Sequence, residues 1–411
     1  MTEAEPELEL EPESAPPQLH GPREALRLVR HSNFGPYFAG NALSASGTWF
    51  QNLAAALLVY RLTHSPLLLG VLNFSQFVPV LVLAPWAGAA ADRRDRKRLL
   101  LVTQSAAAAL SALLGALALA GLASAAVVIV FAAGMGVVSA FSSPSQQSLV
   151  TTLVPPRDLA SAIALNSMTF NLARAVGPAL AAAVIAAAGI PVAFFVNSVS
   201  FVAFVVALLA VHPRPQRRAR HARLRESFVL LRRQPRLVWL LLVVLAAGFG
   251  SDPVNTEAPA FAKAFGHHDT FAGPIIGAFG GGAVAAALLT AGREGSPRRT
   301  VATLALLAAG IAGFAVSPTL VVGFPLLALA GFGYLASNTR ATAQLQLEVD
   351  EWQRGRIMAL WSIAFLGLRP VASLADGALA GAFGVRVAGV CLALPAVVVS
   401  ALVAIRIRRT R

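Results

Sequence analysis

The sequence has few charged residues, one cysteine and two lysines. Asp, Glu, Lys and Arg make up 13% of its 411 residues, against about 25% in soluble proteins. The single cysteine, Cys391, excludes an intramolecular disulfide and a cysteine-based metal site. Neither lysine, Lys97 or Lys263, follows a glycine, so the phosphate loop of an ATP-driven pump is absent.

Residue groups that would support catalysis or bind a cofactor are also missing. Serines in the apolar runs have no paired histidine, and His267 and His268 lie in a short gap, where we interpret them as solvated. The net charge of +14 comes from 33 basic residues, 31 of them arginine, which lie between apolar runs. There they act as orientation signals and lipid contacts. We expect no enzyme activity, no cofactor or metal, and no nucleic-acid partner.

The rest of the chain is strongly apolar, with 56% hydrophobic residues and a mean hydropathy of +0.68. Runs of ~20 apolar residues are long enough to cross a bilayer as helices. The sequence therefore predicts an all-α polytopic membrane protein with twelve transmembrane helices. The runs cover residues 34–60, 66–91, 99–120, 124–147, 160–188, 191–211, 237–261, 271–291, 300–316, 319–345, 356–382 and 385–405.

Basic residues fall in alternate gaps between these runs. Because Lys and Arg are retained in short cytoplasmic loops, this alternation predicts a plasma-membrane protein with both termini in the cytoplasm. The chain then divides into four parts. These are an acidic tail, expected to be disordered, with a basic lead-in (1–31), a six-helix bundle (32–211), a linker with nine arginines (212–236) and a second six-helix bundle with a short basic tail (237–411).

The two bundles are diverged copies of one another. An offset of 195 residues places Arg174 on Arg369 and Gly189 on Gly384. Repeats of this kind are typical of transporters whose halves surround a central cleft.

A dense charged loop, Gly88 to Arg98, separates the uncharged stretches 66–91 and 99–121. Its order, GAAADRRDRKR, resembles the loop 2–3 signature of the major facilitator superfamily. Together with LVYRLTHSPLLLG (58–70) and NLARAVGPALAA (171–182), it makes the chain similar to the twelve-helix drug-exporter branch, which includes the enterobactin exporter and macrolide efflux pumps.

The resemblance implies alternating access, in which the two halves rock about a site at mid-membrane. It assigns a charge latch for the cytoplasmic side, with Gly88 allowing close helix approach; the alternative is a simple topology signal. Gly177 and Pro178 match part of an antiporter signature and suit a helix bend, or else form an ordinary kink. The latch residues are Gly88, Asp92, Arg93, Arg96 and Lys97.

The resemblance also implies a cavity lined by the first, fourth, seventh and tenth helices. Polar residues recur on these helices, many at spacings of three and four, so that they share a face. Ordinary hydrogen bonding between helices is the alternative for each of them. The cavity candidates are Asn41, Thr48, Gln51, Asn52, Gln146, Asn255, Tyr334 and Asn338.

Ionisable residues inside the predicted helices are functional candidates because burying them is costly. Arg174, Asp252 and Arg369 fall near mid-membrane, and Glu257 and Asp376 nearer the outer end. A carboxylic acid in a low-dielectric cleft takes up a proton more readily, so Asp252 and Glu257 are the candidates for proton coupling. The two arginines indicate an interior that attracts anionic or catecholate-like solutes, or else they hold the halves together.

The predicted function is export of small amphipathic molecules, either drugs or siderophore-like compounds, by proton antiport. The expected partners are a small-molecule substrate, protons and membrane lipids, and the protein is expected to be a monomer. Two alternatives stay open at this point. One is import or flipping of a lipid-like solute such as lysophospholipid, and the other is a membrane-embedded sensor with a transport fold.

Overall fold

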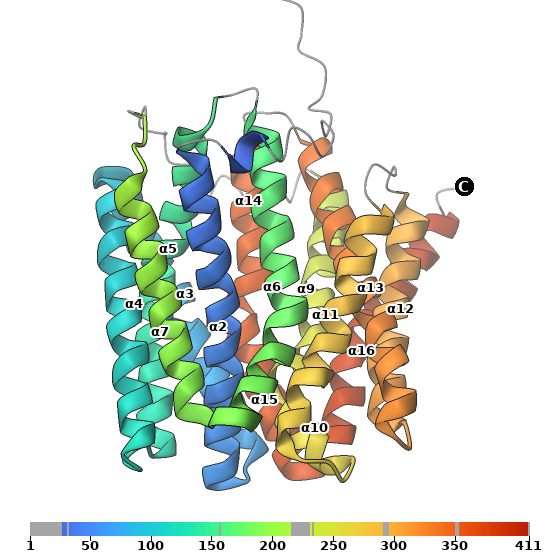
Figure 1. The fold of residues 1–411 in the computed structure, drawn as a ribbon. Helices are drawn as coiled ribbons and strands as arrows, with labels where there is room; N and C mark the ends of the chain where they lie inside the picture. The colour runs from blue at the N-terminus through green and yellow to red at the C-terminus, as the bar shows by residue number, and fades with distance from the viewer. Residues whose placement is uncertain are drawn as a thin grey trace, which may run out of the picture.

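The computed structural model describes residues 27–30, 33–155, 158–214, 231, 234–290, 296–349 and 353–409, and these are almost entirely helical (Figure 1). Eleven helices are long and apolar enough to cross a membrane. Another, α2 (Phe34–Thr63), is 30 residues long and packs along α7 (Ile190–Ala210). With α2 included, the described chain has the twelve spans that the sequence predicts.

The other helices follow in chain order. They are α3 (Pro66–Arg93), α4 (Arg96–Leu119), α5 (Ala125–Leu153), α6 (Leu159–Ala188), α9 (Pro235–Thr256), α10 (Ala258–Ala264), the short 3-10 helix η2 (Asp269–Phe271), α11 (Ala272–Thr290), α12 (Pro297–Val316), α13 (Leu320–Leu347), α14 (Arg354–Ser362), the π-helical turn η4 (Ile363–Gly367), α15 (Arg369–Phe383) and α16 (Val385–Arg409).

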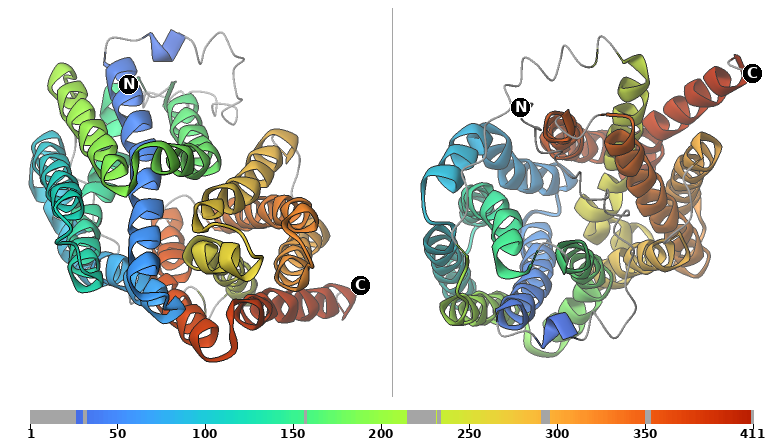
Figure 2. Two further views of the ribbon diagram at one scale, coloured as in Figure 1. Left: turned by 60° about the horizontal axis from the view of Figure 1, so that its bottom comes forward. Right: turned by 90° about the horizontal axis from the view of Figure 1, so that it is seen from above.

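The helices form two groups, which Figure 2 shows side by side. Helices α2–α7 pack mainly on one another, and so do α9–α16. Two helix pairs form most of the packing between the groups: α3 packs on α15, and α6 packs on α11. We call α2–α7 the first group and α9–α16 the second group. The side on which α2 begins and α16 ends is the tail side, and the other end is the opposite side (Figure 1).

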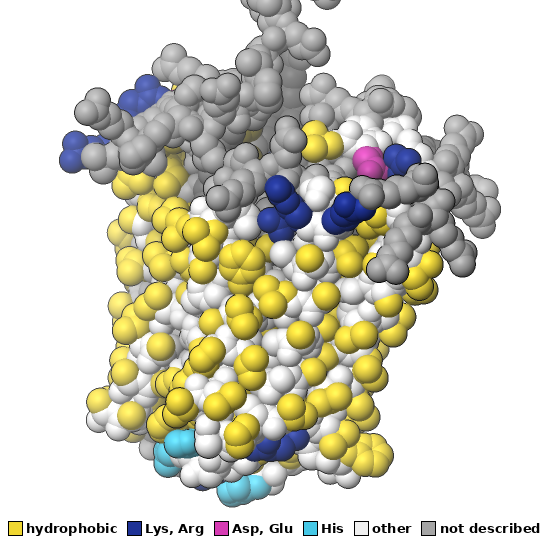
Figure 3. Space-filling model, turned by 90° about the vertical axis from the view of Figure 1, so that its right-hand side faces the viewer, with side chains coloured by type: hydrophobic (Ala, Val, Ile, Leu, Met, Phe, Trp, Pro, Cys, Tyr) yellow, Lys and Arg dark blue, Asp and Glu magenta, His cyan; other side chains and the backbone are white. Residues whose placement is uncertain are grey.

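The outer surface carries an apolar band. Figure 3 shows hydrophobic side chains over most of the height of one face, with Lys and Arg near both ends and His at the opposite side. Over the described chain, large apolar side chains such as Leu119 and Val321 are 72% and 80% exposed. Only a lipid bilayer accommodates so much exposed apolar surface together with helical spans of this length.

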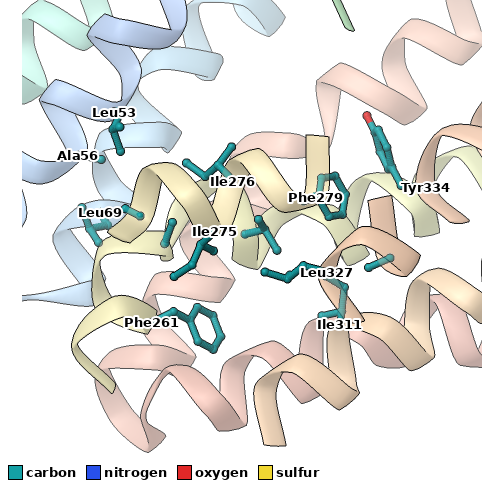
Figure 4. Close-up of a cluster of buried hydrophobic side chains, with 14 of the residues drawn as sticks. Leu53, Ala56, Leu69, Phe261, Ile275, Ile276, Phe279, Ile311, Leu327 and Tyr334 are labelled. Atoms are coloured by element: carbon teal, nitrogen blue, oxygen red, sulfur yellow. The ribbon is translucent and has the colours of Figure 1, made fainter. Parts of the chain in front are cut away.

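One hydrophobic cluster extends across both groups (Figure 4). Leu53 and Leu69 of the first group belong to the same buried cluster as Phe261, Ile276 and Phe279 of the second. The groups therefore share a packed apolar core in this conformation.

The repeat inferred from the sequence is confirmed at two glycines. Gly189 and Gly384 end α6 and α15 with φ of 88° and 86°, a region that favours glycine. Each donates its N–H to the carbonyl four residues earlier, at 2.9 Å. The same helix end thus recurs at the predicted offset.

Two of the predicted spans are interrupted. The seventh breaks at Glu257, between α9 and α10, and the eleventh passes through η4 between α14 and α15. Pro259 and Pro370 follow the breaks, and neither has an N–H to continue the helical ladder. Interrupted helices expose backbone and side chains at depth and mark binding sites in many transporters.

Candidate functional site

Backbone contacts between glycine-containing helices join the two groups. A Cβ atom added to Gly280 of α11 would lie 3.0 Å from the carbonyl oxygen of Arg174 in α6. One added to Gly377 of α15 would lie 2.9 Å from Cα of Gly70 in α3. Small residues permit this close approach between membrane helices.

Three carboxyl groups are buried together near these contacts. Asp252, Glu257 and Asp376 are at most 1% exposed, and their charges interact. Asp252 accepts hydrogen bonds from the hydroxyls of Thr256 and Ser373, each at 3.0 Å, and lies 4.0 Å from Nε of Arg369. Asp252 therefore ties α9 to α15.

Glu257 and Asp376 are different because none of their four carboxyl oxygens has a hydrogen-bond partner in the described part of the chain. Glu257 lies in the break between α9 and α10, and Asp376 lies in α15. An ionised carboxylate buried in this way costs several kcal/mol. Each of these groups therefore needs a bound proton or a cation to be stable where it is.

The second buried feature is the guanidinium group of Arg174, which is held by aromatic rings. Its Cζ atom lies 4.5 Å from the ring centroid of Tyr334, 5.3 Å from that of Phe279 and 6.0 Å from that of Trp49. We call these three residues the aromatic cage; Figure 4 shows Phe279 and Tyr334 near one another. The cage joins α2 and α6 of the first group to α11 and α13 of the second. Arg174 is 6% exposed, and its Nε and Nη2 atoms have no hydrogen-bond partner among the described residues.

Arg369, the repeat counterpart of Arg174, also reaches across the boundary between the groups. Its Cζ atom lies 4.5 Å from the ring centroid of Phe77 in α3, while its counter-ion, Asp252, is in its own group. Both repeat-related arginines therefore lie where the groups meet.

A family model described as "Transmembrane secretion effector", of the major facilitator type, matches residues 25–410. The chain belongs to this transporter family. Two curated relatives are similar to it over most of their lengths. The staphyloferrin A transporter of Staphylococcus aureus is 26% identical and covers 85% of this chain and 90% of the relative. The multidrug efflux pump Tap of Mycobacterium tuberculosis is 25% identical over 93% of this chain and 96% of the relative.

Solved structures confirm the fold. A bacterial homologue of the human lysosomal transporter Spinster, in an inward-facing and occupied conformation, matches 95% of this chain and 98% of its own with a TM-score of 0.74 at 14% identity. A D-xylose–proton symporter matches 90% of this chain and 97% of its own with a TM-score of 0.71, also at 14% identity. The protein is thus a multi-pass membrane transporter of small molecules rather than an enzyme.

In this transporter, the cavity candidates on α2 make contacts within the first group. Gln51 is buried and accepts hydrogen bonds from Ser111 and Asn197, and a cavity role for it stays a prediction. The Gln51 side chain lies in a buried polar cluster with Ser111 and Asn197. The other three candidates also have partners: Asn41 donates to Asn166, Asn52 accepts from Gln76, and Thr48 donates to the carbonyl of Ser44.

The cavity candidates on the other helices have fewer hydrogen bonds from their side chains. Asn255 and Asn338 each have a buried side-chain oxygen without a hydrogen-bond partner in the described chain. Gln146 is half-buried, and its backbone carbonyl accepts from the hydroxyl of Tyr37 at 3.3 Å. Tyr334, in the aromatic cage, faces the first group. A cavity role for these four residues stays a prediction.

The predicted charge latch lies on the tail side, between α3 and α4. Arg93 is exposed, Arg96 donates to the carbonyl of Ala91, and Lys97 donates to two carbonyls at the end of α7, at 2.7 and 3.2 Å. The side chain of Asp92 lies outside the described residues. A Cβ atom on Gly88 would meet nothing within 4 Å in this conformation, and a close helix approach there stays a prediction. The latch itself stays a prediction.

Gly177 of α6 packs closely against α2. A Cβ atom added to it would lie 2.8 Å from Cβ of Trp49 in α2. Helix α6 continues through Pro178. A bend at Gly177 and Pro178 during transport stays a prediction.

Sequence reasoning missed an ion pair that joins the groups on the opposite side. Arg61, near the end of α2, donates from Nε and Nη2 to the two carboxylate oxygens of Asp269, at 2.6 and 3.0 Å. His268 lies 2.9 Å from the same carboxylate. Arg61 is charged but lies at a helix end, so in the sequence it resembles an ordinary boundary residue.

We expect Arg61→Asp to reduce transport severalfold, because two carboxylates would then face each other where the groups meet. The double variant Arg61→Asp/Asp269→Arg should recover part of the loss, since the pair is restored with its charges exchanged. Uptake or efflux in proteoliposomes would measure both. The Arg61 side chain is 38% exposed, and this exposure limits the expected loss of transport. Equal activity in the wild type and the single variant would show that the pair contributes nothing to transport.

Proposed function

We propose that this transporter exports small amphipathic molecules, drug-like or siderophore-like, by alternating access coupled to proton entry. It would act as a monomer in the plasma membrane with both termini in the cytoplasm. The observation that carries the proposal is the pair of buried carboxyl groups without partners, Glu257 and Asp376, beside the contacts that join the two groups.

The positions of the contacts between the groups support alternating access. The Arg61–Asp269 pair and the Gly70–Gly377 approach lie on the opposite side, and the Gly280–Ala175 approach lies at mid-height. On the tail side, α14 packs on α9 and α13 of its own group. We take this as the conformation closed on the opposite side, with α3–α15 and α6–α11 as the contacts about which the groups rock.

Proton coupling would act through the carboxyl cluster. Glu257 faces Asp252 and Asp376, and its charge also acts on Tyr60 of the first group, while Asp252 faces Arg369. Protonation of Asp252 removes its attraction for Arg369 and loosens the tie between α9 and α15. Because α15 packs on α3, this change would reach the boundary between the groups.

The relatives support the solute classes. One is a transporter of staphyloferrin A, and another is a multidrug efflux pump. The proposed solutes fall within the range that these two names cover.

Accumulation of dyes, macrolides and a catecholate siderophore would test the proposal. The measurement uses cells that lack their own pumps, with and without this protein, before and after collapse of the proton gradient. We expect lowered accumulation that returns to the control level without the gradient. Unchanged or raised accumulation would overturn export and favour uptake of a lipid-like solute or a sensor role.

Glu257→Gln and Asp376→Asn, each keeping the side-chain shape, should lower gradient-driven transport at least about tenfold. Both variants should still fold, because an amide removes a buried charge that has no partner. Glu348→Gln, at an exposed acid on the tail side, is the matched control and should behave as the wild type. Efflux in proteoliposomes at several pH values would measure the effect, and unchanged pH dependence in both variants would exclude these groups from coupling.

A further inference from the structure

We propose that Arg174 and the aromatic cage form a binding site for amphipathic organic acids, with the carboxylate on the guanidinium and the apolar part against the rings. The proposal rests on the proposed function and names its substrate class. Arg174 is the central residue because it is a buried cation, it lies where both groups meet, and it has no acidic partner among the described residues.

The unpartnered edge of Arg174 has the chemistry to hold a carboxylate. Nε and Nη2 lie on the same edge of the guanidinium group, and both lack a hydrogen-bond partner. Arg61 uses this same pair of atoms to hold the two oxygens of Asp269. Two parallel charge-assisted hydrogen bonds of this kind are strong and specific for planar carboxylates.

Two half-buried arginines, Arg369 and Arg386, differ from Arg174 because each has a partner for its guanidinium group. Arg369 has Asp252 as its counter-ion. Arg386 stacks on the ring of Phe265 at 4.5 Å, much as Arg174 stacks on Tyr334, but its Nη1 donates to the carbonyls of Ala315 and Ser317. Arg386 thus shows an arginine with a structural role in this fold.

The aromatic cage defines the rest of the solute. Tyr334, Phe279 and Trp49 surround the cation from three helices, so a solute that reaches Arg174 meets apolar ring surface beside it. A purely hydrophilic anion would form the ion pair with Arg174. Its polar surface would then lie against the three rings, which would gain no apolar contact. An acid with an aromatic or aliphatic body matches both features.

Binding of 2-naphthoate to the purified full-length protein tests the proposal. The protein is placed in phosphatidylcholine nanodiscs and titrated calorimetrically with 2-naphthoate and with the neutral 2-naphthamide. We expect saturable binding of the acid and at least tenfold weaker binding of the amide. Arg174→Lys should weaken naphthoate binding at least tenfold, because an ammonium group cannot form the two-bond fork, while Arg386→Lys should bind as the wild type.

Several outcomes would overturn the proposal. One is equal binding of the acid and the amide by the wild type, a comparison that does not depend on the folding of any variant. Another is unchanged naphthoate binding by Arg174→Lys. Competitive loss of naphthoate binding in phosphatidylglycerol nanodiscs would assign the site to a lipid headgroup instead. Thermal unfolding checks that each variant is folded. Tyr334→Leu, which keeps Arg174 but removes a ring of the aromatic cage, should weaken naphthoate binding severalfold.

The same variants separate this proposal from the proposed function. Gradient-driven dye efflux together with no naphthoate binding would overturn the organic-acid site alone. Specific naphthoate binding in a protein that moves no solute in cells or proteoliposomes would overturn export and leave the site in place.

Discussion

Gly280→Ala is expected to reduce transport at least about tenfold, whereas Gly281→Ala, at the next position, should leave transport unchanged. A Cβ atom on residue 280 would clash with Cα of Ala175 and lie 3.0 Å from its backbone nitrogen. Backbone atoms cannot move aside as a flexible side chain can. Helices α6 and α11 would therefore have to separate, at a cost of about 1–3 kcal/mol, and Arg174 would move out of the aromatic cage.

The two neighbouring glycines make this a controlled comparison. Gly281 is exposed, and a Cβ atom there meets nothing within 4 Å. Alanine in a helix interior is intrinsically favoured over glycine by about 1 kcal/mol, so a loss at 280 and none at 281 would isolate the helix contact. Efflux and thermal unfolding of both purified variants would measure it. Equal activity of the two variants would show that the α6–α11 approach is not required.

Replacing Asp252 with alanine is expected to destabilise the transporter and abolish coupled transport. The change removes the acceptor for Thr256 and Ser373 and leaves Arg369 without its counter-ion. Removing one partner of a buried ion pair costs about 3–5 kcal/mol. The cost here should lie below that range, because the Arg369 side chain is 24% exposed and 4.0 Å from the carboxylate.

A double variant separates folding from function. Asp252→Asn/Arg369→Gln removes both charges and keeps hydrogen-bonding groups on α9 and α15, so thermal unfolding should return close to that of the wild type. Gradient-driven transport should stay lost if Asp252 carries the proton. Full transport by the double variant would contradict the proton-carrying role of Asp252. An unfolding temperature no higher than that of Asp252→Ala would contradict a stabilising role for the Asp252–Arg369 ion pair.

Helix positions and the repeat followed from the sequence because each depends on local properties. Apolar runs set the spans, and Gly189 and Gly384 end helices in the same way because glycine alone accepts that backbone conformation readily. The breaks at Glu257 and η4 were missed because proline does not always interrupt a helix. Pro178 and Pro253 lie within continuous helices, whereas Pro259 and Pro370 follow breaks.

The candidate site was predicted in part. Intramembrane charge identified Arg174, Asp252, Glu257, Arg369 and Asp376 because the cost of burying a charge is visible in any apolar run. Residues whose role depends on a neighbour were not identified. Phe279 and Trp49 look like ordinary apolar residues, and Gln51 has the spacing of a cavity residue although it bonds to Ser111 and Asn197.

The sequence by itself determined the membrane class, the twelve spans, the repeat and the set of buried charges, because hydropathy and charge are properties of single residues and short segments. Only the tertiary structure decided which charges are paired. Asp252 meets Arg369 and Arg61 meets Asp269, whereas Glu257 and Asp376 have no hydrogen-bond partner among the described residues and Arg174 meets only rings there. Pairing depends on how α2, α9, α11 and α15 pack across the boundary between the groups, and residues far apart in the chain set that packing.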